Sequence, residues 1–159
     1  MISVTIPNEG RIISRLNFTG LGSTAVTHVR VQTFLVALNT SALTVSLVSP
    51  SGTTAILCSE GDLGSPDVFN GTIWDENCPE NLANLTSDPI GLLPALQPDE
   101  TFANFTGEDP NGSWQLVVVD DSATPNSAQL SRWFLDLNRN QISIPFDFSL
   151  ASNFVHLKP

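Results

Sequence analysis

Apolar and polar residues alternate along most of this chain, and a period of two predicts β-strands. Residues 43–47 alternate cleanly. Residues 29–38 alternate and then become a continuous apolar run, which predicts a strand covered on both faces. In residues 114–118 and 133–137, a tryptophan and the apolar residues after it occupy every second position and share one strand face. The pattern predicts an all-β chain with the first tryptophan of each of these two segments in the core.

Turn-forming residues separate the predicted strands. Residues 49–52, Ser-Pro-Ser-Gly, predict a tight turn because proline fixes φ and glycine supplies conformational freedom. Residues 108–112 predict a second turn, and residues 120–127 a longer hairpin loop. Residues 60–98 are rich in Pro and Gly and are interpreted as long connections across one end of a sandwich. Trp74 lies there and is the tryptophan expected to form an exposed contact.

The last part of the chain is interpreted as an extension. We divide the sequence into a sandwich domain, residues 1–138, and a tail, residues 139–159. Residues 141–148 alternate and predict an extra strand, in which Pro145 suits an edge position because proline donates no ladder hydrogen bond. Apolar residues of the tail are costly to expose and are expected to contact another domain or subunit: Phe146, Phe148, Phe154, Val155 and Leu157. The alternative is an edge strand that closes the chain's own sandwich.

Composition narrows the possible partners. Sixteen acidic and six basic residues give a formal net charge of −10, and no basic patch is present, which argues against nucleic acid and anionic membranes. No apolar run approaches the length of a membrane span, so no membrane insertion is expected. Residues 1–7 alternate like a strand and do not read as a signal peptide. The acidic balance permits cation binding.

Catalytic motifs do not emerge from the sequence. The two histidines are His28 and His156, but the sequence has no G-x-S-x-G motif that would supply a nucleophilic serine. It also has no H-E-x-x-H motif and no phosphate-binding loop. The chain is therefore predicted not to be an enzyme.

Acidic residues on the loops are candidate calcium ligands, because Ca²⁺ takes six to eight oxygen ligands from carboxylates, amides and carbonyls. The candidates fall in the long connections and beside the Trp114 strand: Asp67, Asp75, Glu76, Asp109, Asp120 and Asp121. The alternative is that these acids form turns and solubilise the surface. No loop has the spacing of an EF-hand.

Two further features suggest an exported protein. Cys58 and Cys78 could form a disulfide that pins the irregular region, against the alternative of two buried thiols. Six N-x-S/T sequons are compatible with a glycosylated exterior: Asn17, Asn39, Asn70, Asn84, Asn104 and Asn111.

Three segments carry a family resemblance. Residues 43–53, Leu-Thr-Val-Ser-Leu-Val-Ser-Pro-Ser-Gly-Thr, resemble the motif D-L-x-I-x-L-x-S-P-S-G-T. Residues 102–120 resemble F-x-G-x-x-x-x-G-x-W-x-L-x-V-x-D, and residues 130–137 resemble L-x-x-W-x-L-x-I. These motifs belong to the P domain (Homo B domain) that follows the catalytic domain of subtilisin-like proprotein convertases. One departure is Ala42, where the family commonly has Asp.

The resemblance implies a jelly-roll-like β-sandwich of about eight or nine antiparallel strands, noncatalytic, that supports the folding and stability of a protease domain. It also likens Trp74-Asp75-Glu76 to a family segment in which an acidic pair follows an aromatic residue. The expected function is an extracytoplasmic module that stabilises or positions an exported protein, with calcium as a candidate ligand and a protein domain as partner. The alternative is a structural subunit of an extracellular filament, surface layer or virion, in which identical subunits assemble through the tail. Either function places the chain outside the cell or on a cell or virion surface.

Overall fold

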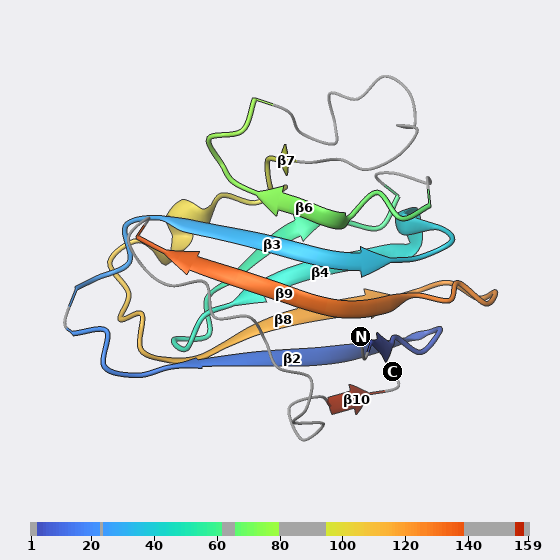
Figure 1. The fold of residues 1–159 in the computed structure, drawn as a ribbon, viewed down its shortest axis with the longest axis horizontal. Helices are drawn as coiled ribbons and strands as arrows, with labels where there is room; N and C mark the ends of the chain where they lie inside the picture. The colour runs from blue at the N-terminus through green and yellow to red at the C-terminus, as the bar shows by residue number, and fades with distance from the viewer. Residues whose placement is uncertain (1–2, 23, 62–65, 80–94, 139–154, 158–159) are drawn as a thin grey trace.

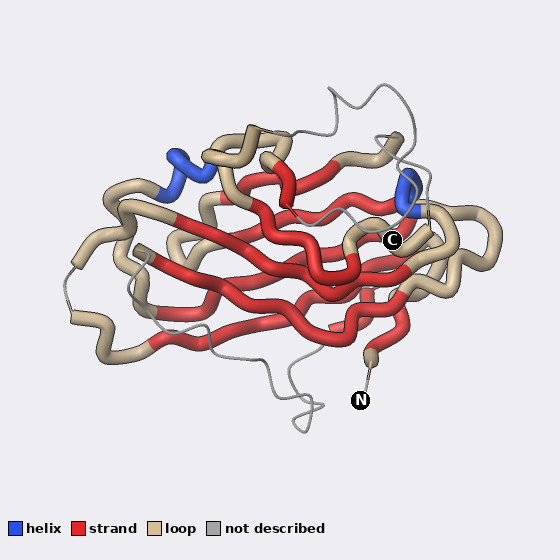
Figure 2. Tube along the Cα trace, turned by 45° about the horizontal axis from the view of Figure 1, so that its top comes forward, coloured by secondary structure: helices blue, strands red, loops and turns tan. Residues whose placement is uncertain are grey.

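The computed structural model describes residues 3–22, 24–61, 66–79, 95–138 and 155–157, which form two β-sheets packed face to face (Figures 1 and 2). Sheet A has the spatial order β1 (Val4–Thr5), β9 (Gln129–Leu137), β3 (Val29–Val36), β6 (Asn70–Trp74), β7 (Ala95–Leu96). Sheet B has the order β10 (Val155–Leu157), β2 (Gly10–Phe18), β8 (Gly112–Asp120), β4 (Leu43–Val48), β5 (Thr54–Cys58). Two short 3-10 helices lie in the connections, η1 (Thr40–Ala42) and η3 (Phe102–Phe105).

Neighbouring strands of the described chain pair antiparallel, except for the parallel pair β6–β7. Successive described strands lie in opposite sheets, except for the pairs β4–β5 and β6–β7, whose members share a sheet. The predicted all-β sandwich is confirmed. The described residues contain ten strands against the predicted eight or nine, and the surplus comes from strands as short as the two-residue β1 and β7.

Side-chain alternation fills the space between the sheets. In β3, β4 and β8 every second residue is buried and faces the opposite sheet. Trp114 and Trp133 have no exposed surface, so their predicted core positions are confirmed. The Trp133 indole N–H donates to Ser14 Oγ at 2.8 Å, which satisfies its polar atom inside the core.

The predicted exposure of Trp74 is wrong. Trp74 is fully buried at the end of β6. Its indole N–H donates to Thr33 Oγ1 at 3.0 Å, and its ring centroid lies 5.2 Å from that of Phe69. The interpretation of residues 60–98 as connections is also corrected, because this region supplies β6 and β7 to sheet A. Pairing with β3 holds β6 in the sheet. Gly71, at φ +102°, allows the shift in register beside Phe34.

The predicted turn at residues 49–52 packs closely on the start of β8. The Gly52 N–H donates to Ser49 O at 3.0 Å, and the Ser49 N–H to Thr53 O at 2.9 Å. Gly112 opens β8 at φ +123°, and a Cβ at this position would lie 2.7 Å from Pro50 Cβ. The two motif segments therefore meet at a contact that only glycine permits.

The tail meets its own chain at β10. Val155, His156 and Leu157 pair antiparallel with Ile13, Ile12 and Arg11 of β2, as an edge strand of sheet B. This pairing agrees with the alternative interpretation of the tail as an intramolecular edge strand. The predicted strand at residues 141–148 and the contact residues Phe146, Phe148 and Phe154 lie outside the described residues.

Candidate functional site

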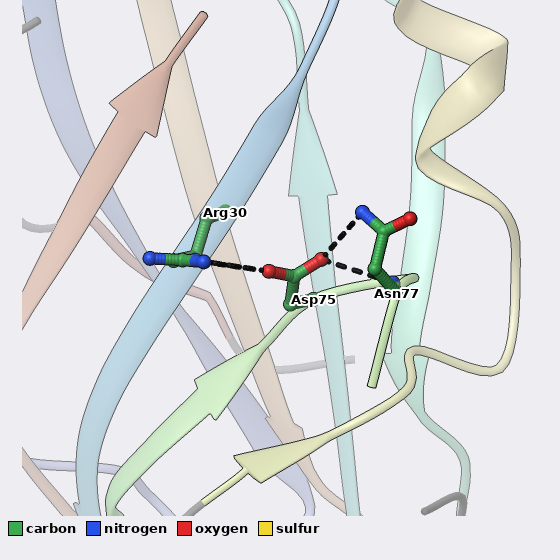
Figure 3. Close-up of polar contacts among 3 residues, drawn as sticks. All are labelled: Arg30, Asp75 and Asn77. Atoms are coloured by element: carbon green, nitrogen blue, oxygen red, sulfur yellow. Dashed lines mark hydrogen bonds and ion pairs between the residues drawn. The ribbon is translucent and has the colours of Figure 1, made fainter. Parts of the chain in front are cut away.

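An ion pair on sheet A brings together two residues that are distant in sequence (Figure 3). Arg30 on β3 donates from Nη2 to Asp75 Oδ2 at 2.8 Å and from Nε to the same oxygen at 3.1 Å. The other carboxylate oxygen accepts from the Asn77 backbone N–H at 2.9 Å and from its side-chain amide at 3.0 Å. Because both oxygens of Asp75 are engaged, this candidate calcium ligand ties the end of β6 to β3.

The surroundings of Asp75 alter its ionisation. Burial alone raises the pKa of the carboxyl group, but hydrogen bonds from Asn77 and the Arg30 guanidinium outweigh it and hold the pKa below its ordinary 3.8. Since the folded-state pKa is depressed, the carboxylate stabilises the fold above the unfolded-state pKa. That stabilisation disappears as the pH falls through the folded-state value.

Asp75→Asn is expected to lower the free energy of unfolding at neutral pH by about 1–2 kcal/mol, because a charge-assisted network is weakened beside a partly exposed arginine. The difference from wild type should shrink once the pH falls below about 3.8. Urea denaturation of the variant and of the wild type, at pH values from neutral to below 3.8, measures this difference in the free energy of unfolding. Arg30→Gln is the control, since it keeps the Asn77 hydrogen bonds and should lose less. A difference independent of pH would contradict this account.

A second polar network surrounds Asp120, the last residue of β8, which is fully buried. Asp120 Oδ1 accepts from the Ser122 N–H at 3.0 Å, from the Ser122 hydroxyl and from the Asn126 amide at 3.3 Å. The same amide donates to Asn39 O at 2.9 Å, and Asn126 Oδ1 accepts from the Asn39 N–H at 2.7 Å. The carboxylate therefore anchors the β8–β9 loop to the connection between β3 and β4.

Two other candidate ligands, Asp67 and Asp109, accept hydrogen bonds from backbone N–H groups. Asp67 is exposed at φ +57°, and its Oδ1 accepts from the Ala37 N–H at 3.0 Å. Asp109 Oδ1 accepts from the Asn111 N–H at 2.9 Å and from its side-chain amide at 2.7 Å. Those bonds, the backbone bond first, hold the pKa of Asp109 below its ordinary value. Asp109 therefore has the turn-forming geometry of the alternative interpretation, whereas the carboxylate of Asp67 binds a backbone group 30 residues away in sequence.

The last two candidates lie apart from these turns. Glu76 Oε2 accepts from the Thr101 hydroxyl at 2.9 Å, which links the segment after β6 to the start of η3. Asp121 is exposed, and its N–H donates to Ala42 O at 3.0 Å. Within the described ranges, no group of three or more His, Cys, Asp or Glu side chains lies close enough to hold a metal ion. Calcium binding stays a prediction of the sequence.

That prediction requires Ca²⁺ to stabilise the folded state by mass action. Millimolar Ca²⁺ should then raise the melting temperature above its value in EDTA, and the double variant Asp120→Asn, Asp121→Asn should lose the rise. The shift between the two buffers is the quantity to compare, because Asp120 also anchors a loop and the variant starts less stable. Equal melting temperatures of the wild type in both buffers would remove calcium from the account.

The predicted disulfide is not formed in this structure. Cys58 is buried at the end of β5 in sheet B, and Cys78 is half-buried after β6 of sheet A, each as a thiol. The irregular region is held at this point by backbone hydrogen bonds instead, for example from the Cys78 N–H to Asp75 O at 2.9 Å.

The sequons differ in how their asparagines are used. Asn111 donates from Nδ2 to Gly22 O at 3.0 Å and to Asp109 at 2.7 Å, and a glycan on Nδ2 leaves one N–H, so at least one of these bonds would be lost. Asn70 is half-buried in β6, and Asn84 lies outside the described residues. The remaining acceptors are exposed residues: Asn17, Asn39 and Asn104. Glycosylation stays a prediction.

A patch on the outer face of sheet A was missed by sequence reasoning. The Arg132 guanidinium lies 4.0 Å from the ring centroid of Phe34 and 5.9 Å from that of Phe134, and the two rings meet edge to face at 6.0 Å. All three residues are half-buried. The sequence did contain a signal for this patch, namely the alternation of the strand. Phe134 falls between the core residues Trp133 and Leu135, so its side chain had to point away from the core.

No helix in the described part of the chain is long and apolar enough to cross a lipid bilayer.

Together these features define a β-sandwich module whose polar clusters bind its own loops to its strands. A model of the proprotein convertase P-domain matches residues 26–137, well over half of the chain. The chain belongs to the proprotein convertase P-domain family, and the resemblance found in its motifs is confirmed. This family is a non-catalytic module of proteases.

Solved structures give a weaker likeness. The crystal structure of a serine protease of Aeromonas sobria is 19% identical, with 91% of this chain and 24% of that chain covered and a TM-score of 0.34. The same organism's serine protease in complex with a chaperone is 18% identical, with 92% and 24% covered and a TM-score of 0.34. This chain thus spans about a quarter of those proteins. No match was found among proteins of curated function.

Proposed function

We propose that this chain is a non-catalytic, extracytoplasmic P-domain module that stabilises or positions an exported protein. The observation that carries the proposal is the family match over residues 26–137, which runs from the residues before β3 to the end of β9. Its most specific motif residues serve packing: Gly112 admits Pro50, and Trp114 fills the space between the sheets. A module built this way contributes through its surface and its stability.

The acidic, lysine-poor composition and the exposed sequons support a location outside the cytoplasm. The partner in this proposal is another protein domain, because the family accompanies proteases. Nucleic acid is an unsuitable partner for a chain with a formal net charge of −10.

The test compares the protein that contains or accompanies this chain, produced with and without it. We expect the neighbour to lose several degrees of melting temperature and part of its secreted yield without the module. The chain alone should leave casein and peptide nitroanilides intact. Hydrolysis by the chain alone, or a neighbour indifferent to its removal, would overturn the proposal.

The alternative is a structural subunit assembled through the tail. It rested partly on a tail free to contact a neighbour, but Val155–Leu157 pairs with β2 of the same chain. Large assemblies of the purified chain in light scattering would restore it.

A further inference from the structure

Within the described residues, strand β9 has one edge that is open along most of its length. It pairs with β3 along its length and with β1 only at Gln129 and Leu130, and no other described strand pairs with it. Figure 1 shows β9 at the border of its sheet, with the short β1 near the N-terminal mark. On an edge strand, alternate residues turn their N–H and C=O groups outward. From Ser131 to Leu137 these groups therefore have no strand partner within the described chain.

The outer face of this open stretch carries a charged–aromatic–charged pattern. Arg132, Phe134 and Asp136 occupy alternate positions, so they project on the same side of the sheet. Arginine and aromatic residues are enriched in protein interfaces relative to the rest of the surface. Stacking on Phe34 at 4.0 Å holds the Arg132 guanidinium in place, so little side-chain freedom remains to be lost on binding.

Two polar atoms of this pattern lack partners. Arg132 Nε and Asp136 Oδ1 are both buried and have no hydrogen-bond partner among the described residues. Arg30 lies opposite Asp136 on β3, but its guanidinium is held by Asp75 at 2.8 Å. Arg132 and Asp136 are half-buried side chains of opposite charge, so an incoming strand that places an acid opposite Arg132 and a base opposite Asp136 would complement both.

The chain itself supplies such a strand. The open stretch from Ser131 to Leu137 is centred on Phe134. When two copies of it pair antiparallel about a twofold axis at Phe134, the Arg132 of each copy faces the Asp136 of the other, and the phenylalanines face each other. The pairing ends before Leu130, so β1 stays in place on both copies. A twofold interface of this kind is self-complementary.

We propose that this protein forms a symmetric dimer through the open edges of two β9 strands, which joins two copies of sheet A into one continuous sheet. Main-chain hydrogen bonds hold the strands together, and the Arg132–Asp136 pairs set their direction and register. The dimer goes beyond the proposed function and does not depend on it, since it is measured on this chain alone.

Charge reversal tests the register. Wild type should sediment near twice the 17.1 kDa of one chain at high concentration and dissociate on dilution. Arg132→Asp and Asp136→Arg should each weaken the dimer by at least about tenfold, because like charges then face each other twice. An equimolar mixture of the two variants should recover a heterodimer, since opposite charges meet again. Arg15→Asp, on the outer face of sheet B, is the matched control and should dimerise normally.

Cross-linking tests the geometry independently of charge. In a Cys78→Ser background, Phe134→Cys should form a disulfide-linked dimer under mild oxidation, because facing residues of paired strands have Cβ atoms about 4.5–5.5 Å apart. Gln32→Cys, one strand further inside the sheet, should not. A monomer at all soluble concentrations overturns the proposal. So does a dimer unaffected by Arg132→Asp, a mixture of the two variants that stays monomeric, or a Phe134→Cys variant that does not cross-link.

Discussion

Replacing Trp114 by alanine is expected to lower the free energy of unfolding by about 3–5 kcal/mol, the usual cost of removing a large buried aromatic side chain. Trp114 has no exposed surface, and its ring lies 5.3 Å from that of Phe105 in an edge-to-face contact. Its indole N–H donates to Pro110 O at 2.9 Å, so truncation also leaves a buried carbonyl without its partner. Because domains of this size are stable by about 5–15 kcal/mol, the variant should be marginally folded.

Urea denaturation followed by circular dichroism measures this loss. Gln115→Ala is the matched control, since the next residue of β8 faces outward, is half-buried, and should change stability by about 0.5 kcal/mol or less. If the alanine variant is insoluble, Trp114→Phe keeps most of the volume and isolates the hydrogen bond to Pro110. A variant as stable as Gln115→Ala would show that the core does not depend on this ring.

Gly112→Ala is expected to cost about 2–4 kcal/mol, for two reasons that add. At φ +123° an alanine is strained whatever the space around it. The new Cβ would also lie 2.7 Å from Pro50 Cβ and 3.0 Å from Pro50 Cγ, so the turn after β4 would have to move. The substitution therefore separates the two motif segments that meet at this point.

A second glycine tells the two causes apart. Gly107 has φ +90° with nothing within 4 Å of its ideal Cβ, so Gly107→Ala carries the strain without the clash. The excess cost of Gly112→Ala in denaturation experiments should fall when Pro50→Gly is added, because that change removes the opposing ring. Equal costs for both glycines would mean that the Pro50 contact is unimportant.

The sequence predicted those strands in which apolar and polar residues alternate. Residues 43–47 and 114–118 alternate on a period of two, and each became a strand with every second residue buried. The tight turn at residues 49–52 was likewise legible, since proline and glycine act on their own φ angles. These features depend on neighbours along the chain, so they need no knowledge of the fold.

Long-range contacts decided the rest. The sequence predicted loops for residues 60–98. β6 is nevertheless a strand, because it pairs with β3 and the sandwich buries Trp74. The sequence placed Asp120 at the start of a loop. In the structure this residue is completely buried, and its carboxylate accepts a hydrogen bond from Asn126 of the same loop. Neither outcome follows from local pattern, because burial depends on which distant segments arrive on top of a residue.

The candidate site shows the same division. The sequence located the acidic residues proposed as calcium ligands, but only the fold showed that they lie apart and that Arg30 and Asn77 hydrogen-bond to Asp75. Alternation put Phe134 on the outer face. Only the pairing of β9 with β3 brought Phe34 beside Arg132 and left one edge of β9 without a strand partner in the described chain. By itself the sequence determined the strands with local alternation, the inward faces of those strands and the family resemblance. The tertiary structure alone decided which polar groups meet, because hydrogen bonds and ion pairs form between residues that only the fold brings within 3 Å or so.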